Sequence, residues 1–295
     1  MNPPRFDSIS SDCPLRSEGQ RSLKGYLKHW SLSRSPFRSG RTESIFLGEG
    51  HREALAGLAH FAGSRWKLAL LVSEPRCGAT TLLNHVRQWQ GLGNTAIEAV
   101  VTNGGLSDAA ATYRSLHEAF GLPLNSSDPK IEVNSAIRMS DKKGVQTVWM
   151  IDACDTRTIA IASELADRHR NLSVVAGTRP DERIALSHAA RKCSMRIDLS
   201  PISLADVTPF LNHGFQLANV FANPFTSSAQ KRLHEFSAGV IGKMADLAES
   251  SLMLAANHEL DTITADLVEA TAEVSRLYSE HRKKTTSNRH ASRAA

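Results

Sequence analysis

The segment Lys67–Val86 reads KLALLVSEPRCGATTLLNHV. It starts with a short apolar run, and small polar residues follow that run. The apolar part is typical of a buried strand, and a helix-like segment starts near Ala79 after a turn-rich loop. Strand, loop and helix in this order are the setting of the phosphate-binding pattern G-x-x-x-x-G-K-[ST]. Gly78 and Thr80 match its second glycine and its hydroxyl residue. These types predict backbone contacts to phosphate and a hydroxyl for Mg²⁺.

The loop departs from that pattern at positions that carry its chemistry. Ser73 stands at the first glycine, and Ala79 stands where a lysine would meet the terminal phosphates. A charge-assisted hydrogen bond of that kind contributes roughly 1.5–3 kcal/mol. Arg76 occupies a tight-turn position that prefers glycine, and it could bring a positive charge with a different geometry. Pro75 removes one backbone donor.

Two later strand candidates end in polar residues that could complete such a site. VWMID ends at Asp152, the place of an acid that holds Mg²⁺ through water, and Ala153 stands where a hydrolysing enzyme has a water-orienting glutamate. Loss of a general base costs about 10²–10⁴ in rate. Asp155 is shifted by two residues, which disfavours it as a substitute. VVAGT ends at Thr178, which either senses the γ-phosphate or simply terminates the strand.

These observations predict a nucleotide site that has lost its catalytic groups. The predicted Mg²⁺ ligands are Thr80 and Asp152. The predicted nucleotide-binding residues are Ser73, Arg76, Gly78, Ala79, Thr80, Thr81 and Thr178. No catalytic residue is assigned.

Apolar runs alternating with helical patterns predict an α/β domain with a parallel sheet covered on both faces. The expected strands are 68–72, 96–101, 148–151, 172–178 and 195–203. The expected helices of this domain are 45–63, 107–120, 131–139 and one that runs to residue 170. From residue 203 only helical patterns occur, at 203–218, 226–237, 241–257 and 264–280, which predicts a small all-helical domain.

Charge is unevenly distributed along the chain of 295 residues. Residues 1–41 carry eight Lys/Arg against three Asp/Glu, and residues 282–295 carry five against none, so the body between them is acidic on balance. Basic arms can bind nucleic acid or an anionic membrane, although most are solubilising tails. We therefore expect a basic, largely disordered arm at 1–41 with a docking segment at 24–37, an α/β domain at 42–202, a helical domain at 203–280 and a basic disordered tail at 281–295.

The cysteines and the hydropathy bear on the compartment. Cys13, Cys77, Cys154 and Cys193 are scattered without a C-x-x-C pair, which disfavours a zinc site or a disulfide framework and favours the reducing cytoplasm. No apolar run approaches the ~20 residues of a membrane span.

The chain resembles a known family over roughly residues 24–280. The segments that carry the likeness are YLKHWSLSRSPF, the strand ending in Asp152, VVAGT, and the stretch from DLSPISLADVTPFLNHGFQLANVF to ADLAESSLMLA. They resemble AAA+ ATPases of the general secretion pathway protein A (ExeA) type. The resemblance implies a P-loop NTPase domain, a helical lid and ATP bound between them.

Carried over by position, the resemblance assigns roles and departures. Ser73–Thr81 would be Walker A, Asp152 the Walker B acid and Thr178 sensor 1. The lid motif G-x-P-R would fall on residues 239–242, so Gly242 replaces the sensor 2 arginine, with Lys243 beside it. Three catalytic positions are therefore replaced.

Three hypotheses follow. The first is a pseudo-ATPase that binds ATP and Mg²⁺ weakly, hydrolyses little or none, and acts as a scaffold or regulatory subunit beside a protein partner or in a homo-oligomer. The second is an active ATPase that remodels a protein or DNA complex, in which Arg76, Lys243 or a neighbouring subunit replaces the lost groups. The third is a DNA- or membrane-associated adaptor that works through its basic arms.

Overall fold

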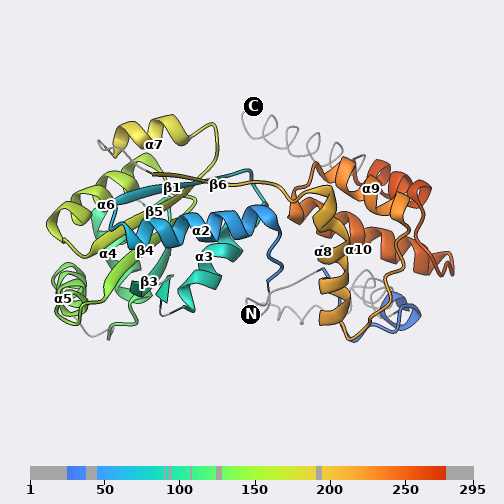
Figure 1. Ribbon diagram of the computed structural model, residues 1–295, viewed down its shortest axis with the longest axis horizontal. Helices are drawn as coiled ribbons and strands as arrows, with labels where there is room; N and C mark the ends of the chain where they lie inside the picture. Colours follow the sequence, from blue (N-terminus) through green and yellow to red (C-terminus); the bar gives the residue numbers. More distant parts are fainter. Residues whose placement is uncertain are drawn as a thin grey trace, which may run out of the picture. The chain divides into compact units, whose positions relative to one another are not determined.

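The computed structural model describes residues 25–37, 45–89, 91–92, 95–106, 108–123, 128–190 and 195–276 (Figure 1). By internal contacts the chain forms two compact units. The α/β unit comprises residues 40–210 and 234–244, and the helical unit comprises 1–39, 211–233 and 245–295. Of the expected disordered arm at 1–41, residues 1–24 and 38–41 lie outside the described residues, as does the expected tail at 281–295. The four-part domain division stays a prediction.

A six-stranded sheet forms the centre of the α/β unit, in the order β2-β3-β4-β5-β1-β6. Its strands are β1 Leu68–Ser73, β2 Gly91–Leu92, β3 Thr95–Asn103, β4 Gln146–Asp152, β5 Leu172–Thr178 and β6 Met195–Leu199. Five strands are parallel, and the short β2 pairs antiparallel with β3. Because the five run the same way, their carboxyl ends form one edge, which is where α/β sheets bind ligands.

The side chains of each buried strand alternate between the two faces of the sheet and pack into two separate hydrophobic cores. Leu68, Leu70 and Val72 of β1 pack on one face, while Ala69 and Leu71 pack on the other. Helices α4 Ala109–Ala119, α5 Pro129–Lys142, α6 Thr156–Arg168 and α7 Arg183–Ala189 cover the first face, and α2 Glu49–Gly63 and α3 Ala79–Arg87 cover the second (Figure 1). The predicted parallel sheet with helices on both faces is therefore confirmed.

Several boundaries differ from the sequence prediction. Helix α2 begins at Glu49 rather than at residue 45, and α6 ends at Arg168 because His169 is extended. Strand β6 ends at Leu199 rather than at residue 203. Helix α7 and strand β2 were not predicted, since each is too short to show a periodic pattern.

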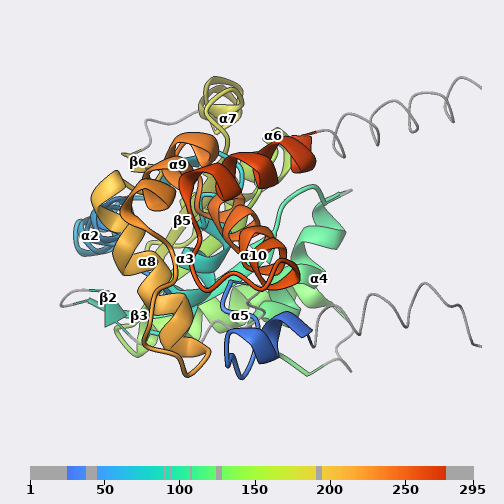
Figure 2. The ribbon, with the colours of Figure 1, turned by 90° about the vertical axis from the view of Figure 1, so that its right-hand side faces the viewer.

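The helical unit contains parts of α8 Leu204–Leu217, α9 Ser227–Ser237 and α10 Ile241–Asn257, followed by a helix whose described part is 265–276. The expected helix at 264–280 thus starts one residue after its predicted start, and its predicted end lies outside the described residues. Residues 25–37 pack beside α10 in the same unit (Figure 2). Among the described helices, none is both long and apolar enough to span a membrane.

The contact of residues 25–37 with α10 centres on one buried carboxylate. Glu249, 2% exposed, accepts hydrogen bonds from the Tyr26 hydroxyl, from Ser35 Oγ at 2.6 Å and from the Phe37 N–H at 3.4 Å. The Phe37 ring packs edge-on against Phe215. A Cβ at Gly214 would come within 2.5 Å of that ring, so the glycine makes room for it.

Candidate functional site

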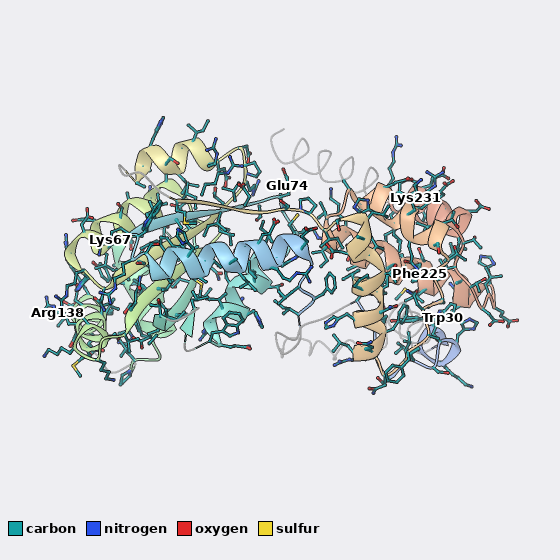
Figure 3. All side chains as sticks on the ribbon, viewed as in Figure 1. Trp30, Lys67, Glu74, Arg138, Phe225 and Lys231 are labelled. Atoms are coloured by element: carbon teal, nitrogen blue, oxygen red, sulfur yellow. The ribbon has the colours of Figure 1, made fainter. Side chains whose placement is uncertain are left out.

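The loop that follows β1 turns tightly at residues 74–77. Figure 3 shows Lys67 and Glu74 at opposite ends of β1, with Glu74 at its carboxyl end. The Cys77 N–H donates to the Glu74 carbonyl at 3.2 Å, and Arg76 has φ +70°. Pro75 with a positive φ after it is the pattern of a type II turn, whose third position favours glycine. The arginine therefore occupies a backbone conformation that glycine adopts more easily.

Ser73 has a different setting from the one expected. It is the last residue of β1, paired with Leu199 of β6, and not a turn residue. The position that the pattern gives to its first glycine is therefore a strand position here, and a strand position imposes no positive φ.

Gly78 has a backbone conformation that favours glycine. It has φ +98° and lies immediately before α3. A Cβ there would approach His51 Nε2 to 2.9 Å. Both the backbone conformation and the neighbour therefore require glycine. Ala79 begins α3, so the position expected for lysine lies at the helix N-terminus, with Thr80 and Thr81 exposed beside it.

The hydroxyl and the carboxylate predicted to hold Mg²⁺ lie together. Thr80 Oγ1 donates to Asp152 Oδ2 at 2.6 Å, although 72 residues separate them in the sequence. Asp152 is the last residue of β4, beside Asn103 at the end of β3. The Thr80 hydroxyl and the Asp152 carboxylate are hard oxygen donors of the kind that Mg²⁺ prefers, so this donor set fits the ion. Asn103 was not singled out from the sequence, and its place in the sheet register is what brings it here.

Ala153 and Asp155 follow Asp152 at the carboxyl edge of the sheet. Ala153 is exposed and has φ +48°. Asp155 caps α6, accepting hydrogen bonds from the Arg157 and Thr158 N–H groups, each at 2.8 Å, and it also accepts from the Gly105 N–H at 2.5 Å. Burial alone would raise the pKa of Asp155, but these bonds lower it. Its oxygens are thus occupied by structural donors.

Thr178 ends β5 next to β1, paired with Val72. Its side chain is 5% exposed, and its hydroxyl lies 3.3 Å from the Arg179 carbonyl. The register places it one strand away from the loop. That position is compatible with both interpretations made from the sequence.

Residues 239–244 belong to the α/β unit and lie against the loop. The Gly242 N–H donates to the Arg76 carbonyl at 3.0 Å, and Arg76 Nη2 donates to the Gly242 carbonyl at 2.7 Å. Burial raises the pKa of the Cys77 thiol, and the nearby Lys243 ammonium opposes that rise. The lid position expected to carry an arginine thus meets an arginine of the loop instead.

His51 is a buried residue that the sequence did not single out. It is 3% exposed and packs on Gly78 from α2. Burial lowers its pKa below the ordinary value of 6.5, while a hydrogen bond to the Cys77 backbone and the Asp206 carboxylate act the other way. Its Nδ1 has no hydrogen-bond partner among the residues that the structure describes. Only the fold brings it to the loop, so no local signal marks it.

Solved structures of ATPases resemble this chain in fold. A Walker-type ATPase of Pyrococcus abyssi matches with a TM-score of 0.53 and 13% identity, over 84% of this chain and 77% of that one. The ORC2 protein of Aeropyrum pernix, in ADPNP–ADP complexes, gives 0.56 and 11%, over 82% and 71%. The ORC1 protein of Aeropyrum pernix, in complex with DNA, gives 0.54 and 13%, over 81% and 68%.

The chain has the fold of a P-loop ATPase. This confirms the predicted fold class, an AAA+-type α/β sheet accompanied by a helical part. No family model and no curated protein matches the sequence. At 11–13% identity the likeness concerns the fold alone.

Proposed function

We propose that this protein is a pseudo-ATPase of the ExeA-like AAA+ type, which binds Mg·ATP weakly and acts as a scaffold or regulatory subunit. The observation that carries the proposal is the 2.6 Å hydrogen bond between Thr80 and Asp152, which keeps both Mg²⁺ donors in one place. Beside them, Ala79, Ala153 and Gly242 stand where lysine, glutamate and arginine would act. In this proposal the groups that bind Mg·ATP are retained, and the three replacements remove groups that hydrolysis would use.

Each retained group has a defined task in this proposal. Gly78 and the first N–H groups of α3 would receive phosphate oxygens at a helix N-terminus. Thr80 and Asp152 would hold Mg²⁺, which neutralises phosphate charge when bound. Thr178 and Arg76 would line the same edge of the sheet. With alanine at residue 153, no side chain there orients or deprotonates water.

The test is a calorimetric titration with Mg·ATP and with a slowly hydrolysed analogue. We expect weak binding that depends on Mg²⁺, and about a tenfold loss of affinity in Thr80→Val, corresponding to one lost contact of about 1.4 kcal/mol. Thr262→Val, an exposed threonine of the helical unit, is the matched control. Absence of binding at millimolar nucleotide would contradict a nucleotide-binding role and leave the fold as a scaffold.

The second candidate function is an active ATPase that remodels a protein or DNA complex. The position of Lys243 near Cys77, together with Arg76 in the loop, favours it, since either cation could replace the lost lysine or arginine. Turnover at about 1–100 per second would support this candidate against the first. That turnover should then fall in Lys243→Ala or Arg76→Ala.

Partners and compartment follow as further parts of the proposal. Two of the structures similar in fold are ORC proteins, one of them in complex with DNA, which supports a nucleic-acid partner. The basic arms supply charge for nucleic acid or an anionic membrane, and such binding would weaken steeply with salt. Persistence of that binding after deletion of residues 282–295 would exclude the tail. We place the protein in the cytoplasm.

A further inference from the structure

Arg76 and Gly242 form a reciprocal pair, although 166 residues separate them in the chain. One bond joins the Gly242 N–H to the Arg76 carbonyl at 3.0 Å, and the other joins Arg76 Nη2 to the Gly242 carbonyl at 2.7 Å. Both residues belong to the α/β unit. The pair therefore connects the loop between β1 and α3, residues 74–78, to the first turn of α10. We call this loop the phosphate loop.

The space around Gly242 is matched to the arginine. A Cβ at residue 242 would lie 2.9 Å from Arg76 Cβ, 3.0 Å from its Nε and 3.1 Å from its carbonyl oxygen. Two of these atoms are backbone or fixed to it, so a larger residue could not be accommodated by a simple side-chain rotation. The glycine at 242 and the arginine at 76 are thus two halves of one contact.

The rest of this segment has anchors besides the contact with Arg76. Gly239, with φ +70°, accepts at its carbonyl from the Ile202 N–H at 2.9 Å. Val240 is 5% exposed and packs in the core between the sheet and helices α2 and α3. The contact with Arg76 is thus a polar link added to an apolar anchoring that the loop shares through Cys77.

The chemistry of the guanidinium makes this contact sensitive to anions. In the structure one of its N–H groups bonds to a neutral carbonyl, whereas a bond to phosphate joins opposite charges and is roughly twice as strong. Arg76 precedes Gly78 and the start of α3, where the proposed function places the phosphates. A phosphate there and the Gly242 carbonyl would compete for the same side chain.

We propose that Arg76 and Gly242 form an interlock that holds the phosphate loop against the start of α10, and that its side-chain bond is released when Arg76 turns to a bound phosphate. The coupling to phosphate rests on the proposed function, whereas the interlock exists without ligand. It makes Arg76 a residue that links nucleotide occupancy to the position of residues 241–244. In the free protein the interlock lowers the fraction of molecules ready to bind.

The test compares Gly242→Ala with Gly63→Ala. The second is a matched control in the same unit, because a Cβ at Gly63 meets only Thr95 Oγ1, at 3.9 Å. In Gly242→Ala we expect amide hydrogen exchange over residues 74–79 and 239–244 to speed up by about tenfold without ligand. We also expect Mg·ATP to bind about three- to tenfold more tightly, since the binding-competent fraction rises. Gly63→Ala should change neither quantity.

The possible negative results distinguish failure of the interlock, of the competition with phosphate and of the proposed function. Unchanged exchange in Gly242→Ala overturns the interlock, whether or not nucleotide binds. Faster exchange with unchanged or weaker affinity overturns the competition with phosphate while the proposed function stands. If neither wild type nor variant binds nucleotide, the coupling falls together with the proposed function, and faster exchange supports the interlock as a structural contact.

A second variant keeps the test decisive if Gly242→Ala does not fold. Arg76→Gly suits the positive φ of that position and removes the guanidinium. It should fold, exchange about tenfold faster over residues 239–244, and bind Mg·ATP more weakly because a phosphate contact is lost. Exchange equal to that of wild type in this variant overturns the proposal.

Discussion

At the scale of single residues, His51 should make stability depend on pH. Its pKa in the folded protein is below 6.5, because burial disfavours the imidazolium. At pH values between the pKa of His51 in the folded protein and 6.5, the unfolded chain binds more protons than the folded protein does. The free energy of unfolding therefore rises with pH in this range, and the contribution of His51 to stability is lost as the pH falls below 6.5. Acidification adds a proton that the buried ring, packed on Gly78, accommodates poorly.

We predict that urea denaturation from about pH 7.5 down to about pH 5.5 shows falling stability in wild type and a shallower fall in His51→Gln. The slope should not vanish, because His169 also has a lowered pKa through burial and the nearby Arg138 and Lys67. Parallel profiles for the two proteins would contradict the assignment to His51.

At the scale of elements, Asp155 joins two loops at the carboxyl edge of the sheet. It caps α6 and holds the Gly105 N–H after β3. We predict that Asp155→Ala lowers the free energy of unfolding by about 1–2 kcal/mol, the usual cost of a lost N-cap. Asp155→Asn should cost much less because asparagine is also a good cap. Chemical denaturation measures both, and equal losses would count against the capping role.

The central elements could be predicted from sequence because their signals are local. β5 has the predicted bounds Leu172–Thr178, since every residue of that run is buried, and α3 begins at Ala79 as predicted. The start of α2 could not be predicted, because Glu49 donates its N–H to Asp206, 157 residues away. The role of Asp155 could have been found, since an aspartate at the start of a helical pattern is a common N-cap signal.

The candidate site also contains residues that could be predicted from the sequence and residues that could not. Gly78, Thr80 and Asp152 could be found from spacing along strand ends, and the structure brings the last two into contact. His51 and the partner of Arg76 could not be found, because each depends on packing between segments far apart in the chain. Gly242 could be recognised as a missing arginine, but not as the counterpart of Arg76.

At the scale of the whole molecule, Glu249 fastens the N-terminal segment 25–37 to α10. The Tyr26 hydroxyl, the Ser35 hydroxyl and the Phe37 N–H all donate to it, so an amide there would turn its own N–H₂ toward a donor. We predict that Glu249→Gln lowers stability by about 1–3 kcal/mol and speeds hydrogen exchange over residues 25–37. Glu273→Gln, an exposed glutamate of the same unit, is the control. Unchanged exchange in 25–37 would show that the apolar contacts suffice.

The order in which the chain supplies its two units has a consequence for synthesis. Residues 234–244 return to the α/β unit after residues 211–233 have entered the helical unit. A ribosome that has delivered every strand of the sheet has therefore not yet delivered Val240, which fills the core beside α2 and α3, or Gly242, which meets Arg76. The α/β unit can be completed only after part of the helical unit has been made. A single cut between residues 210 and 234 would leave that unit short of its last segment.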